Sequence, residues 1–294
     1  MFVPKIGLPA KAKIAVGLIL YIPVQMLVTA LFSALGLPSL LRGPIWSEVL
    51  NTFEVVLGTL AMVALWDRRP LGGLGLAVDT KSPRRLVTGM LVGGALALVV
   101  WLVFVAGGWA KVIGLGGGGA SPSPGDRVSA IPQALLPGLV VNLIIFLCGA
   151  ITEEIIARGY ILQGLKRLWG PYPALALSSA AFALFHAGYG GDHQVLFVVN
   201  VLLAGLLFGY AYLATASLWL PIGLHLGWNF TVGPLLGMAV SGSHHPPELI
   251  PTVVTGPWFV AGGHWGPEGG VVATVVLAAA VAVAAALLVK RQRC

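Results

Sequence analysis

Long runs of apolar residues, interrupted by short polar or Gly- and Pro-rich segments, cover most of this chain. Most runs are about 20 residues long, the length that an α-helix needs to cross the roughly 30 Å hydrocarbon core of a bilayer. The pattern predicts an all-α, polytopic membrane protein. We expect eight transmembrane helices, at about 14–36, 47–66, 86–107, 137–168, 172–188, 194–214, 217–237 and 270–289.

The basic residues between these runs predict the orientation of the chain. Eight spans put both termini on one side, and all of the 17 basic residues except Arg42, Lys111 and Arg127 then fall on that side. Because Lys and Arg accumulate in cytoplasmic loops, both termini are predicted to be cytoplasmic. We expect an integral membrane protein, located in the plasma membrane of a prokaryote.

Composition agrees with the apolar pattern and excludes a soluble protein. Hydrophobic residues make up 57% of the chain and charged residues 9%, whereas soluble domains contain roughly 25% charged residues. The net charge of +7 is expected to face an anionic lipid leaflet, and no nucleic-acid partner is expected. Cys148 and Cys294 provide no disulfide framework. No internal repeat is visible, so residues 1–294 are interpreted as one membrane domain.

Three charged residues interrupt the predicted helix at 137–168. Glu153, Glu154 and Arg158 lie within six residues of one another in an otherwise apolar run. Each ionisable side chain at this depth costs at least ~2.5 kcal/mol, so such residues are functional-site candidates. At about 48 Å the helix is longer than the apolar core, so it must tilt, break or protrude into the cytoplasm.

Helical spacing separates the roles of these charges. Glu154 and Arg158 are four residues apart, so they are expected to form an ion pair on one helix face. Glu153 is rotated by about 100° from Glu154 and faces a different neighbour. His225 and Asn229, in the predicted helix at 217–237, are also four residues apart and share one face.

Depth within the membrane brings residues of three predicted helices together. A rise of 1.5 Å per residue places Glu153, His186, His225 and Asn229 close enough in depth to meet. Glu153 can act as a general base on water and then as an acid toward the leaving amine. His225 and Asn229 can donate hydrogen bonds to an oxyanion. Alternatively, Glu153, His186 and His225 ligate a zinc ion, although the chain has no HExxH motif.

Three motifs in this order resemble the CPBP family of intramembrane proteases, which includes type II CAAX prenyl endopeptidases and abortive-infection (ABI) proteins. Its patterns EExxxR, FxxxH and HxxxN match Glu153–Arg158, Phe182–His186 and His225–Asn229. The resemblance covers about 137–237, which we treat as the catalytic helices. It implies an eight-helix endopeptidase in which Glu153 and His186 activate water, while His225 and Asn229 form the oxyanion hole. Glu154, Arg158 and Phe182 would support them.

The resemblance also implies a membrane-associated protein or peptide as substrate, cleaved near its C-terminus at a prenylated cysteine in some members. Some members are classed as metalloendopeptidases, so the zinc alternative stays open. A second interpretation is a non-catalytic immunity factor or proton-coupled transporter that uses the same buried charges. Glu54 is expected near the outer interface. The histidines at 244, 245 and 264 are expected in a mobile, solvated outer loop.

Overall fold

The computed structural model describes residues 9–116, 134–188 and 191–293, and these residues are mostly helical. Arg127, Cys294 and most of the Gly/Ser/Pro-rich stretch lie outside them. The α-helices are α1 (Ala10–Ala34), α2 (Leu37–Leu40), α3 (Pro44–Ala61), α4 (Ser82–Ala106), α5 (Leu135–Glu154), α6 (Leu162–Trp169), α7 (Pro171–Ala187), α8 (Gln194–Thr215), α9 (Trp219–Phe230), α10 (Trp258–Ala261) and α11 (Val271–Arg293). The π-helical segments are η1 (Met62–Asp67), η3 (Ile155–Ile161) and η4 (Thr231–Leu235), and the 3₁₀ segments are η2 (Leu71–Leu74) and η5 (Gly263–Gly269).

Six helical segments in the described part of the chain are long and apolar enough to cross a membrane. They are Ala10–Ala34, Pro44–Asp67, Ser82–Ala106, Leu135–Trp169, Gln194–Thr215 and Gly263–Lys290. Each overlaps one of the predicted spans, so those helices are confirmed as apolar helices of membrane-crossing length.

The other two predicted spans are helical but short. The range 172–188 corresponds to α7, which has 17 residues, and 217–237 corresponds to α9, which has 12 and continues into the five residues of η4. A perpendicular crossing needs about 20 residues. The structure therefore supports six full-length spans, and the count of eight stays a prediction.

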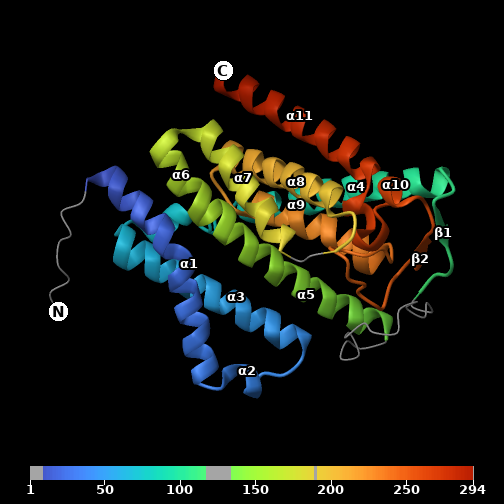
Figure 1. The fold of residues 1–294 in the computed structure, drawn as a ribbon, viewed down its shortest axis with the longest axis horizontal. Helices are drawn as coiled ribbons and strands as arrows, with labels where there is room; N and C mark the ends of the chain where they lie inside the picture. Colours follow the sequence, from blue (N-terminus) through green and yellow to red (C-terminus); the bar gives the residue numbers. More distant parts are fainter. Residues whose placement is uncertain (1–8, 117–133, 189–190, 294) are drawn as a thin grey trace.

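One continuous helical rod organises the molecule. Residues 135–169 run as α5, η3 and α6 without a break (Figure 1), for 35 residues. Helices α1 and α3 lie on one side of this rod, and α4, α7, α8, α9 and α11 gather on the other. The long predicted helix at 137–168 thus stays continuous, but its geometry changes to π-helical in the middle.

Glycines allow α4 and α9 to pack with their backbones in contact. A Cβ atom added at Gly93 of α4 would collide with the Leu224 carbonyl of α9, and one added at Gly227 of α9 would collide with the Met90 carbonyl of α4. Small residues at helix interfaces permit such close packing inside membranes. This packing fixes the position of α9, the helix that carries His225 and Asn229.

A short antiparallel pair of strands is the one regular departure from helix in the described residues. Strand β1 (Ala110–Val112) pairs with β2 (Thr252–Val254), with Lys111 opposite Val253. The pair attaches the segment after α4 to the long connection between η4 and α11. That connection is therefore fastened to the helix bundle.

Candidate active site

The two adjacent carboxylates lie where the central helix changes geometry. Helix α5 ends at Glu154 and continues as the π-helical segment η3, which contains Arg158. Isolated π-helical turns are rare and occur frequently at functional sites. The side chains differ in exposure: Glu154 and Arg158 are fully buried, whereas Glu153 is 27% exposed. The two carboxylates differ in exposure as predicted for different helix faces, although both approach His225.

The predicted ion pair is present. Arg158 donates from Nη1 to Glu154 Oε1 at 2.6 Å and from Nη2 to the carbonyl of Gly205 at 2.9 Å. Its guanidinium also lies over the Phe182 ring, 4.5 Å from the ring centre. A buried charge is costly unless it is paired and hydrogen-bonded. Arg158 meets both conditions and links η3 to α7 and α8.

Glu154 has a second contact that sequence reasoning missed. Its Oε1 atom is also 3.2 Å from Nδ1 of His225. A carboxylate only accepts hydrogen bonds, so Nδ1 of His225 is the donor, and its Nε2 atom points away from Glu154. Helical spacing within one helix carries no information about the distance between residues 154 and 225. Glu154 therefore orients His225 as well as pairing with Arg158.

His186 is oriented by its own helix. Its Nδ1 atom lies 2.9 Å from the carbonyl oxygen of Phe182, so Nδ1 carries a proton. The rings of Phe182 and His186 are in contact, with centroids 4.6 Å apart. The remaining nitrogen, Nε2, faces Glu153 Oε2 at 3.5 Å. Phe182 thus positions His186 through both its carbonyl and its ring.

Glu153 lies between the two imidazoles. Its Oε2 atom is 3.5 Å from Nε2 of His186 and 3.9 Å from Nε2 of His225. Both distances are longer than a good hydrogen bond. No described residue donates a hydrogen bond to this buried oxygen. Its lone pairs are therefore available to a proton donor between the three side chains.

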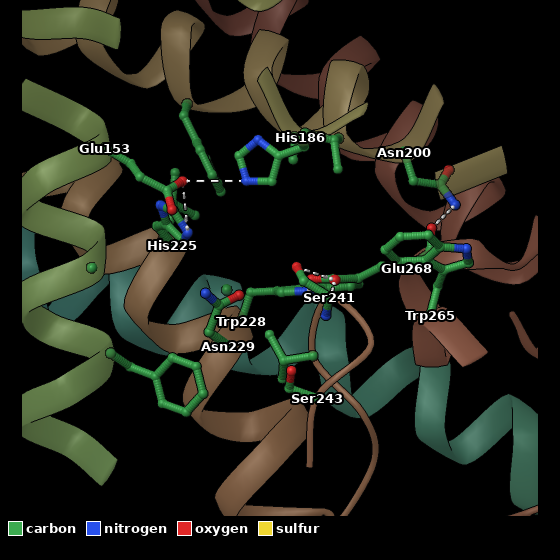
Figure 2. Close-up of a pocket in the computed structure, with 18 of the residues that line it drawn as sticks. Glu153, His186, Asn200, His225, Trp228, Asn229, Ser241, Ser243, Trp265 and Glu268 are labelled. Atoms are coloured by element: carbon green, nitrogen blue, oxygen red, sulfur yellow. Dashed lines mark hydrogen bonds and ion pairs between the residues drawn. The ribbon is translucent and has the colours of Figure 1, made fainter. Parts of the chain in front are cut away.

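The three side chains open onto a cavity of about 720 Å³ inside the bundle. Figure 2 shows Glu153, His186 and His225 along one part of its wall. Asn229 lines the same cavity, about one helical turn beyond His225 on α9. The structure thus brings all four predicted catalytic residues to one cavity. Aromatic rings of Phe146, Phe182 and Phe208 make much of the remaining wall apolar.

The helices that carry these residues also match a known family. The model described as "Type II CAAX prenyl endopeptidase Rce1-like" matches residues 135–231. Residues 135–231 are thus similar to the Rce1-like family. The resemblance predicted from the three motifs is therefore confirmed, and the match together with the apolar helices identifies an integral membrane protein. A search of curated proteins found no match to the chain.

The Rce1-like region does not form a metal site in this arrangement. Among the residues that the structure describes, no group of three His, Cys, Asp or Glu side chains could hold a metal ion. The predicted zinc ligands Glu153, His186 and His225 therefore do not fit a zinc ion as they lie here.

The prediction of a solvated outer loop is wrong for much of this segment, although His264 is exposed. Residues 236–270 follow the Rce1-like region and fold into the cavity wall, where Met238 and Trp265 are each 1% exposed. His245 and His264 line the cavity, and the His245 ring contacts Phe146. The many prolines and glycines of this segment suggested a loop, but several of its apolar residues are buried, among them Met238, Val240 and Trp265.

Glu268 is the principal residue that sequence reasoning missed. It lies in η5 and lines the same cavity (Figure 2). Glu48 of α3 also lines the cavity. Neither residue belongs to a motif with Glu153. The available signal was a carboxylate directly before the final apolar run.

Proposed function

We propose that the protein is an intramembrane endopeptidase of the CAAX type. The observation that carries the proposal is the position of Glu153, whose Oε2 atom faces Nε2 of both His186 and His225 at the wall of a cavity. A carboxylate between two imidazoles can move protons, and a cavity walled by aromatic rings can admit an apolar peptide. The Rce1-like family suggests the same activity.

In this mechanism Glu153 and His186 activate a water molecule. Glu153 takes a proton as the water oxygen bonds to the scissile carbonyl carbon. The tetrahedral oxyanion accepts hydrogen bonds from His225 and Asn229. When the C–N bond breaks, Glu153 returns the proton to the leaving amine. His225 Nδ1 donates to Glu154, so an Nε2–H donor requires that the ring be protonated on both nitrogens.

The supporting residues keep this arrangement in place. Glu154 orients His225, Arg158 neutralises Glu154, and Phe182 orients His186. Each of these contacts fixes a ring or a carboxylate and leaves Glu153 Oε2 facing the cavity. Preorganised donors of this kind contribute most of the rate in many enzymes.

The proposal includes the membrane arrangement. Helices α7 and α9 would lie within the membrane beside the six long helices, which gives eight helices and two cytoplasmic termini. The direct contact of the α9 and α4 backbones supports a buried place for α9. The substrate would be a membrane-associated protein or peptide, with or without a prenyl group, cleaved near its C-terminus. Reporter fusions between α7 and α8 and between α8 and α9 would test the two short spans, because both reporters change sides if α7 and α9 do not cross the membrane.

The activity is tested with purified wild type and Glu153→Gln on fluorogenic peptides, farnesylated and unmodified. We expect cleavage by the wild type and a loss of at least ~10³-fold in the variant, because Gln cannot accept the proton. Equal turnover would refute the proposal and favour a non-catalytic role. Full activity after metal removal would exclude the zinc alternative, and loss with recovery on zinc addition would support it.

A further inference from the structure

Glu268 connects the segments that surround the cavity. Its backbone carbonyl accepts a hydrogen bond from Asn200 Nδ2 on α8 at 2.7 Å, and the same amide group donates to the carbonyl of Gly270 at 3.0 Å. Asn200 is 2% exposed, so these bonds form in the interior. The backbone of η5 is therefore held against α8, and the side chain of Glu268 points toward the cavity.

The carboxylate of Glu268 receives three hydrogen bonds from two other segments. Trp228 Nε1 of α9 donates to Oε1 at 3.0 Å. The backbone N–H and the hydroxyl of Ser241 donate to Oε2 at 2.7 and 3.0 Å. Ser241 has a φ of 48°, a left-handed conformation that is unfavourable for a serine and that these two bonds help to stabilise. Figure 2 shows this cluster across the cavity from Glu153.

We propose that Glu268 is a positioning residue for the reaction proposed above, on which this inference rests. By holding Trp228 it sets the end of α9 and thus the direction of Asn229, the next residue. By holding Ser241 it keeps residues 238–243 folded as the cavity wall. Glu268 acts through these neighbours and does not itself transfer the proton.

The position of Asn229 depends on contacts that α9 makes with other segments. Helix α9 ends at Phe230 and continues as the π-helical segment η4, so regular α-helical hydrogen bonding stops one residue after Asn229. The packing of Gly227 against α4 fixes the helix before Asn229. The bond from Trp228 to Glu268 fixes it on the cavity side. Asn229 therefore directly follows two residues that are held by contacts outside α9.

A carboxylate suits this role better than an amide. The three donors use both oxygens of Glu268, whereas Gln has only one acceptor oxygen and would leave a buried donor without a partner. The described residues that line the cavity include no Lys or Arg. Glu268 is therefore held by N–H and O–H donors and not by an ion pair across the cavity.

The test compares wild type, Glu268→Gln and Glu248→Gln in proteoliposomes. Glu248 is a buried carboxylate of the same connection that does not line the cavity, so its variant is the matched control. We measure kcat and KM with a cleaved peptide, and backbone hydrogen exchange over residues 238–243. Glu268→Gln should lower kcat by about 10- to 100-fold, with KM changed by less than about threefold. Exchange over 238–243 should become about tenfold faster.

Wild-type kcat in Glu268→Gln, or unchanged exchange over 238–243, would overturn the inference. If Glu268→Gln does not fold, Trp228→Phe, which removes a single donor, replaces it. This variant should lower kcat by about 3- to 10-fold at unchanged KM. A wild-type kcat in Trp228→Phe would also overturn the inference. The proposed function is refuted by a different result, namely equal peptide turnover by wild type and Glu153→Gln. The exchange experiment needs no substrate and still tests whether Glu268 holds the wall.

Discussion

The cavity has two walls that are built in different ways. The Rce1-like wall, formed by α5, α7 and α9, presents Glu153, His186 and His225 from regular helices. The C-terminal wall, residues 236–270, presents Ser241 and Glu268 from short turns. The family model covers the first wall and ends before the second. The family match thus includes the residues proposed to react. Some of the side chains that complete the cavity wall lie after the matched range.

The two walls also stabilise a carboxylate differently. In the Rce1-like wall, Glu154 is paired with a cation, Arg158, at 2.6 Å. In the C-terminal wall, Glu268 is held by an indole, a hydroxyl and a backbone amide. Removal of one partner should therefore be more damaging in the first wall, because it leaves an uncompensated buried charge.

The largest effect is expected for Arg158→Met. The variant keeps an unbranched apolar side chain but leaves Glu154 buried without its cation, which should reduce stability by about 3 to 5 kcal/mol. Thermal unfolding in detergent measures this loss. Arg85→Met is the control, because the Arg85–Asp79 pair lies at the surface, where ion pairs contribute little. Similar losses in both variants would contradict the special role of the buried pair.

The next effect is expected for Asn229→Ala, which removes a proposed oxyanion donor. Loss of one such donor typically lowers kcat by about 10²- to 10³-fold. The melting temperature should stay close to that of the wild type, because no described residue bonds to the Asn229 side chain. Steady-state kinetics with the peptide used for Glu153→Gln measures the change. A variant with wild-type kcat would remove Asn229 from the mechanism.

A smaller effect is expected in the C-terminal wall for Gly266→Ala. Gly266 has a φ of 66°, and an added Cβ atom would collide with the carbonyl of Ala239. We expect a loss of about 1 to 3 kcal/mol, from strain and overpacking. Gly72→Ala is the control, because no atom lies within 4 Å of its added Cβ. Equal stability of the two variants would show that this wall is not tightly packed.

The smallest effect concerns Glu248, on the connection outside the cavity. Burial raises the pKa of Glu248, so the folded state holds its proton more tightly than the unfolded chain. Wild-type stability therefore falls as pH rises above about 4.3, the usual pKa of a glutamate, until the raised pKa is passed. Glu248→Gln should remove this fall and melt about 1 to 2 °C higher at pH 7. The difference should vanish below pH 4, and a lower melting temperature at pH 7 would contradict it.

The sequence predicts the Rce1-like wall well because its information is local. Apolar runs predict helices, and spacings of four residues predict the Glu154–Arg158 pair. Similar depths within the membrane predict that Glu153, His186 and His225 lie at one site. Crossing length was the weaker part. Helix α7 has the predicted 17 residues, which is short for a span, and α9 ends after 12 residues and continues as η4.

The C-terminal wall could not be predicted in the same way. The contact of Glu268 with Trp228 joins residues 40 positions apart, and that with Ser241 joins residues 27 apart, through turns that have no periodic pattern. The contact of Glu154 with His225 was missed for the same reason. Prolines and glycines correctly predicted irregular backbone here, but they do not tell a solvated loop from one packed into a cavity.

The central claim is that Glu153 activates the water that cleaves the peptide bond. Its most direct test is single-turnover cleavage in heavy-oxygen water by wild type and Glu153→Gln, with products identified by mass spectrometry. We predict one heavy oxygen in the new C-terminal carboxylate of the wild-type product, and a rate at least ~10³-fold lower for the variant. Equal rates for the two proteins, or a wild-type product without heavy oxygen, would contradict the claim.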